Sequence, residues 1–391
     1  MSVVEGFVES GFGLIADAFE KNFELGEEMG AALAMYRHGQ LVIDIYAGTA
    51  DEDTDRAWTE DTLAVGFSMT KGLMAICGYM AEQRGLFSFD EPVSEIWPEF
   101  AQNGKQLTTV RDLFTHRAGL IALDEDLTLE DLANWTPVIL AIEQQSPLWE
   151  PGTDFAYHAL TYGWLTGEVL RRVTGMRPSQ LFANYLTQPL EVDAWIGLPG
   201  SEEHRVARIV EAPPATASDD VAYIVAARSS PAVVKSITMG SALPKFGVSG
   251  SFADFNLPAV HAMEVPAANG IFTAKALAKI YSATVSDGHG PKLLSDSSIA
   301  DALVLRSSGE GWSGAPPAPG IRYSTGFMIN GYPSREMLSD SSFGHDGASG
   351  CLGFADADAE IGFGYINNQM SNGLDNRANR LTSALRHCLE L

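Results

Sequence analysis

The sequence predicts an α+β fold whose antiparallel sheet is built from strands at both ends of the chain. Residues 30–48, GAALAMYRHGQLVIDIYAG, are typical of two strands joined by a tight turn at His38-Gly39. Residues 321–368 contain four further stretches of strand-like composition, and DADAE (356–360) is typical of a hairpin turn. Because helical patterns fill the middle of the chain, we expect one sheet made from both termini, flanked by helices, with a mostly helical insertion.

Apolar residues recur at helical spacing in several segments between and beside these strands. Residues 65–83, VGFSMTKGLMAICGYMAEQ, contain the most apolar of them. The other segments that we expect to form helices are 3–23, 108–120, 161–175, 273–288 (ended by its glycine) and 376–391.

The chain shows no internal repeat and no low-complexity tract. With one sheet expected from both termini, we expect a single domain over residues 1–391. Within it we expect an α/β subdomain of approximately residues 1–85 plus 260–391, and a helical and loop subdomain of approximately residues 86–259. Pro, Gly and Ser cluster through residues 199–260, which predicts irregular loops there.

The charge balance narrows the range of partners. Lys and Arg number 25 against 50 Asp and Glu, which gives a net charge of −25. A field of this sign repels nucleic acid and anionic membranes, so neither is an expected partner. Three cysteines are too few for a disulfide framework and suit a reducing compartment. With no signal peptide and no transmembrane run in the sequence, we expect a cytoplasmic protein of unknown oligomeric state.

No cofactor and no metal are expected. The acidic loop at residues 51–62 places Asp51, Asp53 and Asp55 at calcium-ligand spacing, but Arg56 and Thr62 occupy the positions that need Gly and Glu. HExxH, CxxC and P-loop motifs are missing from the sequence, as is a GxGxxG before a helix.

Ser68 and Lys71 stand three residues apart in FSMTKG, at the head of the most apolar helical segment. Residues i and i+3 share a face of a helix, so the serine hydroxyl and the lysine amine can meet. A serine becomes a strong nucleophile only when a base takes its proton, and a lysine is such a base only when burial lowers its pKa. The pair is therefore a candidate nucleophile and base, and the alternative is a helix cap followed by an ordinary lysine.

Four segments in order along the chain resemble motifs of the serine β-lactamase and penicillin-binding-protein superfamily. They are FSMTKG, TTVRDLFTHRAGL (108–120), PLWEPGTDFAYHALTYGWLTGEVLRRVTG (147–175) and FGHDGASGCLGFADADAEIGFGYINNQ (343–369). The match runs from about residue 30 to 390 and is most similar to the class C β-lactamase-like esterases, also called family VIII carboxylesterases. This resemblance implies the β-lactamase/transpeptidase-like form of the α+β fold.

The resemblance also implies roles for individual residues. Ser68 matches the nucleophile, Lys71 its partner, and Tyr157 the tyrosine that shares base and acid work with the lysine. Ala159 departs from the family, because an asparagine usually stands there and helps to hold the substrate or the lysine. His116 is expected to be structural within its motif, and Trp149 to be a packing residue.

The third motif departs further. Where lactamases carry Lys-Thr-Gly, this chain has His345-Asp346-Gly347, which we expect to contact the substrate. Asp346 would repel a substrate carboxylate, while His345 could donate a hydrogen bond or orient Tyr157. Gly347 would allow close approach by the substrate. The backbone N–H groups of Ser68 and Ala348 are expected to form the oxyanion hole.

The resulting hypothesis is a serine carboxylesterase that cleaves small, short-chain acyl esters through an acyl-enzyme on Ser68. One alternative is a β-lactamase or D-amino-acid peptidase, and a close variant is an acyltransferase in which an alcohol replaces water. Another is a non-catalytic member of the fold that binds without chemistry. Whether Lys71 or Tyr157 is the base stays open, because coupled groups share their titration.

Overall fold

The computed structural model describes residues 3–212, 230–245, 251–316, 320–331, 333, 335–371 and 375–391. Two stretches of the segment expected to be irregular, 213–229 and 246–250, lie outside these residues. Among the described residues, no helix is long and apolar enough to cross a lipid bilayer.

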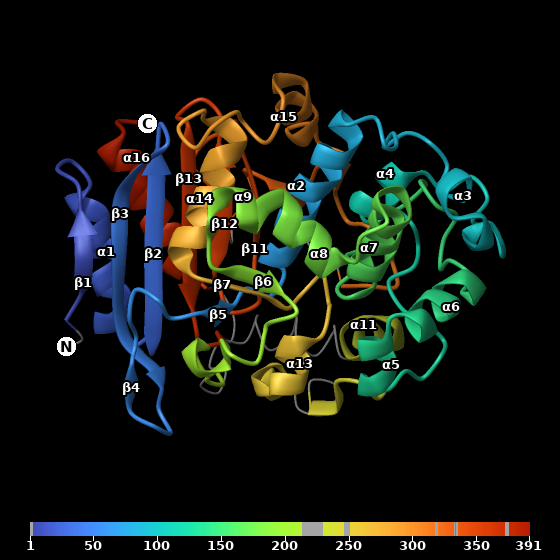
Figure 1. The fold of residues 1–391 in the computed structure, drawn as a ribbon, viewed down its shortest axis with the longest axis horizontal. Coiled ribbons are helices and arrows are strands. Elements are labelled where there is room, and N and C mark those ends of the chain that lie inside the picture. Colours follow the sequence, from blue (N-terminus) through green and yellow to red (C-terminus); the bar gives the residue numbers. More distant parts are fainter. Residues whose placement is uncertain are drawn as a thin grey trace.

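A ten-stranded antiparallel sheet dominates one half of the molecule (Figure 1). Its strands run in the order β1-β3-β2-β13-β12-β11-β10-β9-β8, with β4 paired to β3, and a smaller sheet has the order β5-β7-β6. The large sheet comprises β1 (Glu5–Val8), β2 (Gly30–Arg37), β3 (Gln40–Asp51), β4 (Arg56–Ala57), β8 (Ser307–Ser308), β9 (Arg322–Tyr323), β10 (Met328–Ile329), β11 (Ser342–Asp346), β12 (Leu352–Asp356) and β13 (Ile361–Asn367). The small sheet comprises β5 (Ala64–Val65), β6 (Ala194–Ile196) and β7 (Gly270–Phe272).

The two ends of the chain meet where β13 pairs with β2, with Gly364 opposite Ala34. This pairing confirms the prediction that one sheet is built from both termini. The expected tight turn between β2 and β3 is also present. His38 and Gly39 have φ angles of 49° and 72°, and two consecutive positive φ angles are typical of the turn that joins twisted antiparallel strands.

Helices cover both faces of the large sheet. α1 (Gly13–Glu24) and α16 (Arg377–Cys388) contact each other and share one apolar cluster with the sheet, which includes Phe19, Leu33 and Leu381. On the opposite face, α14 (Ala274–Val285) packs against β13, β2 and β12. It lies so close that a Cβ atom on Gly362 would stand 2.2 Å from the carbonyl oxygen of Ala278.

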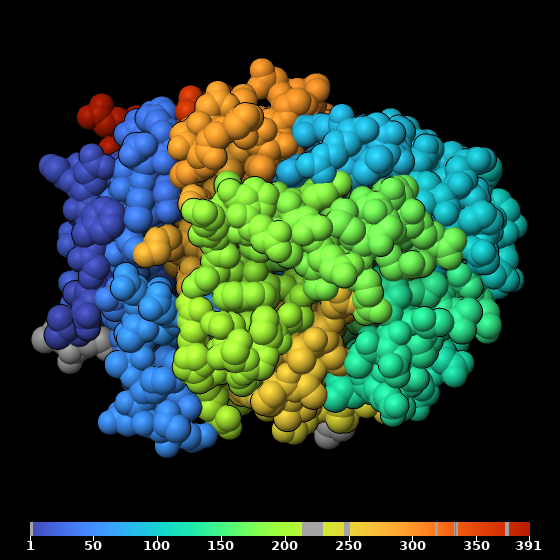
Figure 2. Space-filling view, in the orientation of Figure 1, coloured from blue at the N-terminus to red at the C-terminus, as the bar shows by residue number. Residues whose placement is uncertain are grey.

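α2 (Met69–Gln83) runs between the large sheet and the helical part of the molecule, and its residues from Met69 to Ala81 are all buried. The helical part packs beside the sheet and covers the right-hand side of the space-filling view (Figure 2). The remaining helices are α3 (Val93–Ile96), η1 (Pro98–Phe100), α4 (Val110–Phe114), α5 (Leu129–Asn134), α6 (Thr136–Gln144), α7 (Thr161–Thr174), α8 (Pro178–Phe182), η2 (Ala183–Thr187), α9 (Gln188–Leu190), η3 (Glu203–Arg205), α11 (Pro231–Thr238), η4 (Ala253–Asn256), α13 (Pro258–Ala262) and α15 (Asp296–Ala302).

Three helix boundaries differ from the prediction. The segment 3–23 does not form one helix, because Glu5–Val8 pairs with β3 and the positive φ angles of Gly6 and Gly11 interrupt any helix before Gly13. α4 stops at Phe114, since His116 has a φ angle of 62°. α14 ends at Val285, before the glycine that was expected to end it. The subdomain boundaries near residues 86 and 259 stay a prediction.

Candidate active site

Ser68 stands at the junction between β5 and the buried helix α2. The residue before it, Phe67, has a φ angle of 44°, which is rare for an aromatic side chain and turns the chain sharply into the helix. Thr70 secures the first helical turn, because its hydroxyl donates to the Phe67 carbonyl at 2.6 Å and accepts from the Gly270 N–H at 2.8 Å. Although Ser68 is the N-cap residue of α2, its side chain makes no capping hydrogen bond. Ser68 thus occupies the cap position without using its hydroxyl as a cap.

Lys71 points at Ser68 from the next turn of the same helix. The distance between Lys71 Nζ and Ser68 Oγ is 3.1 Å. The amine also donates to the carbonyl oxygens of Ala159 at 2.8 Å and Ala267 at 2.9 Å. Three polar partners thus surround a side chain that has no exposed surface.

The surroundings of Lys71 favour its neutral form. Burial lowers the pKa of the amine well below its ordinary value, and the Asp346 carboxylate opposes this shift. A neutral amine has two N–H donors and one lone pair. The two carbonyls can accept both donors, and the lone pair then faces the Ser68 hydroxyl.

Tyr157 completes the cluster from the other side. Lys71 Nζ lies 4.7 Å from the centre of its ring, and Ser68 is close enough to act on the pKa of its phenol. Burial raises the pKa of the Tyr157 phenol, the Ser68 side chain works in the opposite direction, and Asp346 adds to the increase. The phenol is therefore protonated at neutral pH in the free protein.

His116 holds Tyr157 in place through the backbone on both sides of it. The Ala156 N–H donates to the His116 carbonyl at 3.2 Å, and the His158 N–H donates to His116 Nδ1 at 3.1 Å. The ring centres of His116 and Tyr157 are 4.8 Å apart. Burial and nearby His158, Lys71 and His345 lower the pKa of His116 well below its usual range, so Nδ1 stays an acceptor. This is the structural role expected of His116.

His345 and Asp346 end strand β11 beside this cluster. His345 Nδ1 lies 2.8 Å from the Asp346 backbone carbonyl, while its buried Nε2 has no hydrogen-bond partner among the described residues. His345 therefore does not orient Tyr157 by a hydrogen bond within the described chain, although their ring centres are 6.2 Å apart. Substrate contact by His345 stays a prediction.

The Asp346 carboxylate is ionised and a quarter exposed. Burial raises its pKa, but a hydrogen bond from His345 and the charge of Arg335 act in the opposite direction, and the pKa lies below its ordinary value. Arg335 Nε lies 3.5 Å from Asp346 Oδ2. Sequence reasoning missed Arg335, because nothing in its local pattern connects it to a residue on β11.

The turn after β11, which carries Ala348, packs against the segment that precedes the nucleophile. A Cβ atom on Gly347 would stand 2.6 Å from the Gly66 carbonyl oxygen and 3.4 Å from Phe67 Cβ, so this turn packs directly against the chain before Ser68. The close approach at Gly347 is thus made by the protein itself, and its contact with substrate stays a prediction. Within the described chain, the N–H groups of Ser68 and Ala348 donate no hydrogen bond, and Ala348 is exposed. Both donors are available to a ligand.

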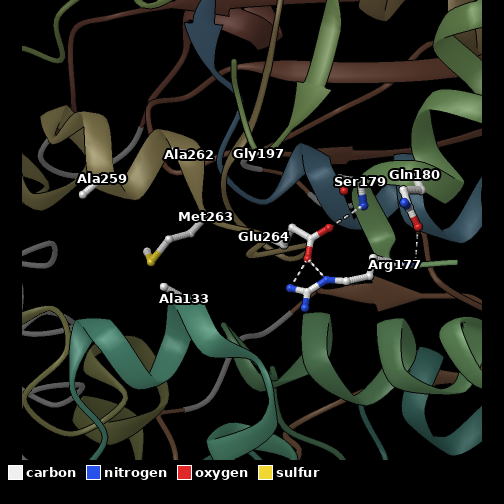
Figure 3. Close-up of a pocket in the computed structure, with 9 residues that line it drawn as sticks. All are labelled: Ala133, Arg177, Ser179, Gln180, Gly197, Ala259, Ala262, Met263 and Glu264. Atoms are coloured by element: carbon white, nitrogen blue, oxygen red, sulfur yellow. Dashed lines mark hydrogen bonds and ion pairs between the residues drawn. The ribbon is translucent and has the colours of Figure 1, made fainter. Parts of the chain in front are cut away.

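A pocket of about 410 Å³ lies elsewhere, between α5, α8 and α13 (Figure 3). An ion pair between Arg177 and Glu264 lies at one side of it, and Met263 at the other. None of its lining residues is a candidate catalytic residue.

Trp149 packs with Trp312 at 5.4 Å between ring centres, which is consistent with its expected packing role. No group of three or more His, Cys, Asp or Glu side chains in the described ranges is arranged to hold a metal ion.

Comparison with known proteins identifies the family. A model of the beta-lactamase family matches residues 16–386. The esterase/beta-lactamase LipL of Mycobacterium tuberculosis (strain ATCC 25618 / H37Rv) is 31% identical over 389 residues, which cover 95% of this chain and 84% of LipL. A family VIII carboxylesterase structure has 32% identity and a TM-score of 0.84, with 99% of this chain and 100% of that chain covered. A penicillin-binding-protein homologue from Caulobacter crescentus has 29% identity and the same TM-score and coverage. The resemblance and the fold class predicted from sequence are confirmed, and the chain belongs to the beta-lactamase family of serine hydrolases.

Proposed function

We propose that this protein is a carboxylesterase that cleaves small, short-chain acyl esters through an acyl-enzyme on Ser68. The observation that carries the proposal is the position of Lys71, whose Nζ lies 3.1 Å from Ser68 Oγ and 2.8 to 2.9 Å from two carbonyl oxygens. A buried amine in that arrangement is a base aimed at the serine proton. The similarity to LipL and to a family VIII carboxylesterase supports an ester as substrate.

In the acylation step, the neutral Lys71 amine takes the Ser68 proton while Oγ attacks the ester carbonyl. The negative charge that develops on the carbonyl oxygen is stabilised by the N–H groups of Ser68 and Ala348. When the tetrahedral intermediate collapses, Tyr157 gives its proton to the leaving alkoxide, which departs as the alcohol. The enzyme then carries a Lys71 ammonium and a Tyr157 phenolate, whose opposite charges stabilise each other.

Deacylation reverses these transfers. The Tyr157 phenolate takes a proton from a water molecule, and the resulting hydroxide attacks the acyl carbonyl. Collapse of the second tetrahedral intermediate releases the carboxylic acid, and the Lys71 ammonium returns its proton to Ser68 Oγ. Protons and charges balance over the two steps, and both residues regain their resting forms.

The charge of Asp346 favours a substrate without a carboxylate. Its ionised side chain is a quarter exposed beside the candidate catalytic residues, in place of the residues that bind a carboxylate in lactamases. A negatively charged substrate group near it is repelled, even though Arg335 partly neutralises the charge. Neutral esters meet no such repulsion.

The test is a side-by-side assay of the wild type, Ser68→Ala and Ser94→Ala on p-nitrophenyl butyrate and on a chromogenic cephalosporin. Ser94 lies on α3 and serves as a matched control, because its hydroxyl donates only to the Gln106 carbonyl. We expect ester hydrolysis in the wild type and in Ser94→Ala, and loss of at least about 10³-fold in kcat for Ser68→Ala. Undiminished ester turnover by folded Ser68→Ala would refute the proposal.

The second candidate is hydrolysis of a lactam or of a D-amino-acid peptide by the same acyl-enzyme chemistry. The similarity to a penicillin-binding-protein homologue favours it, as does the family to which the chain belongs. Dominant opening of the cephalosporin, with ester hydrolysis at background, would favour this candidate. A fluorophosphonate adduct on Ser68 without turnover of either substrate would indicate a nucleophile whose substrate belongs to another class.

A further inference from the structure

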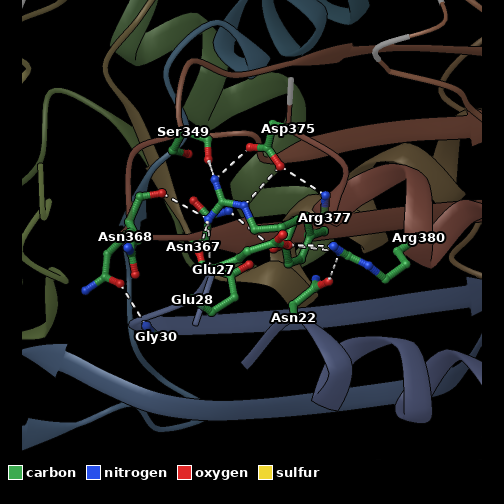
Figure 4. Close-up of polar contacts among 12 residues, drawn as sticks. Asn22, Glu27, Glu28, Gly30, Ser349, Asn367, Asn368, Asp375, Arg377 and Arg380 are labelled. Atoms are coloured by element: carbon green, nitrogen blue, oxygen red, sulfur yellow. Dashed lines mark hydrogen bonds and ion pairs between the residues drawn. The ribbon is translucent and has the colours of Figure 1, made fainter. Parts of the chain in front are cut away.

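Arg377, the first residue of α16, is a buried arginine far along the chain from Ser68. Only 2% of its surface is exposed. Its guanidinium donates to both carboxylate oxygens of Asp375, at 3.0 and 2.7 Å, and to Glu28 Oε2 at 3.0 Å (Figure 4). It also donates to the Glu27 and Gln369 carbonyls. Partners from three separate segments thus bind this planar, five-donor group.

One further hydrogen bond of Arg377 reaches the turn that carries Ala348. Arg377 Nη2 donates to the Ser349 carbonyl oxygen at 2.5 Å (Figure 4). Ser349 is the neighbour of Ala348, and this bond holds the Ser349–Gly350 peptide, two peptide planes after the one that contains the Ala348 N–H.

Asp375 contacts the same turn directly at Gly350 and is linked through Arg335 to Asp346, which precedes the turn. A Cβ atom on Gly350 would stand 1.7 Å from Asp375 Oδ2, so the turn rests directly on this carboxylate. The Asp375 backbone carbonyl accepts a hydrogen bond of 2.8 Å from Arg335, whose guanidinium also lies 3.5 Å from the Asp346 carboxylate. The cluster therefore contacts the turn at Ser349 and Gly350, and Arg335 connects it to Asp346 at the end of β11.

The two acidic partners of Arg377 differ in charge. Burial raises the pKa of Asp375, but the hydrogen bonds and charge of Arg377 outweigh burial and bring it below the ordinary value. For Glu28, burial outweighs the effect of Arg377 and raises the pKa to about 8. Asp375 is thus the ionised partner of Arg377 at neutral pH, and Glu28 is the partner that a neutral amide can replace.

We propose that Arg377, Asp375 and Glu28 are positioning residues that hold the 347–351 turn, and with it the Ala348 N–H, against Ser68. The proposal deepens the esterase mechanism above and rests on it. An oxyanion donor must lie within hydrogen-bond distance of the developing charge, and a small displacement removes most of its effect. Ala348 is the exposed residue of this turn, while Ser349 and Gly350, which contact the cluster, are buried.

The chain offers a matched control on the same helix. Arg380 lies three residues after Arg377 and pairs with Glu27 and Asn22, away from the turn (Figure 4). Lysine retains the charge of arginine but cannot reproduce its fork of donors. Arg377→Lys and Arg380→Lys therefore both keep the charge on α16 and lose guanidinium hydrogen bonds, and only the first removes a contact with Ser349.

The experiment compares both variants and the wild type on p-nitrophenyl butyrate and on its thiono analogue, in which sulfur replaces the carbonyl oxygen. For Arg377→Lys we expect kcat on the oxygen ester to fall about 10- to 100-fold, with KM within about two-fold. The preference for the oxygen ester over the thionoester should shrink as well, because that preference depends on well-placed oxyanion donors. Arg380→Lys should keep the wild-type kcat and preference.

Asp375→Asn gives a second, isosteric variant should Arg377→Lys fail to fold, and Glu28→Gln should have the smallest effect of the three. Equal kcat values and equal oxygen-to-sulfur preferences in the Arg377 or Asp375 variant and in Arg380→Lys would overturn the proposal. Failure of the esterase function itself gives a different result, since the wild type would then show no Ser68-dependent turnover of the ester.

Discussion

The backbone carbonyl oxygen of Ala159 accepts a hydrogen bond of 2.8 Å from Lys71 Nζ. The family usually has an asparagine at this position, and its absence raised the question of what holds the lysine. Backbone groups hold the lysine instead, because the carbonyl oxygens of Ala159 and Ala267 both accept hydrogen bonds from its amine. A side-chain substitution at position 159 cannot remove this contact, so the lysine keeps its orientation without the amide.

The first prediction concerns the lysine itself. Lys71→Arg should lower kcat for ester hydrolysis by about 10²- to 10⁴-fold, because a guanidinium cannot give up its proton and so cannot act as the base. The control is Lys105→Arg. Lys105 is also fully buried and donates to two carbonyls, those of Glu143 and Gln145, and burial lowers its pKa to about 8. Equal losses of kcat in the two variants would show that the effect at Lys71 is only structural.

The second prediction concerns the pH dependence of kcat/KM. Lys71 must be neutral to accept the serine proton, so kcat/KM should rise with pH through the pKa of Lys71 and then level off. The Asp346 charge raises that pKa, since it stabilises the ammonium form. Asp346→Asn should therefore move the acidic limb of the profile to lower pH. A limb that stays in place, or moves to higher pH, would contradict the assignment of Lys71 as the titrating group.

The third prediction separates the two candidate bases. Because burial raises the pKa of Tyr157, its side chain should remain a phenol across the neutral range. Phenolate absorbs near 295 nm, so the difference spectrum between the wild type and Tyr157→Phe should show no phenolate band at neutral pH. A phenolate band that appears in the wild type near neutral pH and is lost in the variant would make the tyrosine the resting base instead.

The sequence predicted those parts of the site that depend on local spacing. Ser68 and Lys71 meet because residues three apart share a helix face, and the apolar residues after them predict the burial that the lysine needs. The strands β2 and β3 and those between residues 321 and 368 were recognisable from composition and turn residues, whereas β1, β4 and β8 were not. Tyr157 could be assigned only through the family resemblance, because nothing in its own segment points to Ser68.

Contacts between distant segments could not be predicted in this way. Arg377 meets Glu28 across 349 residues of sequence and Ser349 across 28, and no periodic pattern records either contact. The sequence held one signal for this cluster: the oppositely charged Asp375 and Arg377 stand two residues apart at the start of an amphipathic helix. The N-terminal error has a similar origin, since the apolar residues of 3–8 fit a strand as well as a helix, and pairing with β3 decides between them.

The last prediction tests the contact between Gly350 and Asp375. Gly350 has a φ angle of 87°, and an added Cβ atom would stand 1.7 Å from Asp375 Oδ2. Gly350→Ala should therefore displace the turn and lower kcat by about 10-fold or more, with a smaller effect on KM. Gly175→Ala controls for backbone strain: its φ angle is 72°, it caps α7, and an added Cβ atom there meets nothing within 4 Å. That control should lose about 1 to 2 kcal/mol of stability from the left-handed conformation alone and keep its kcat. If both variants lose stability and neither loses activity, the turn tolerates displacement, and the Ala348 N–H does not contribute to the transition state.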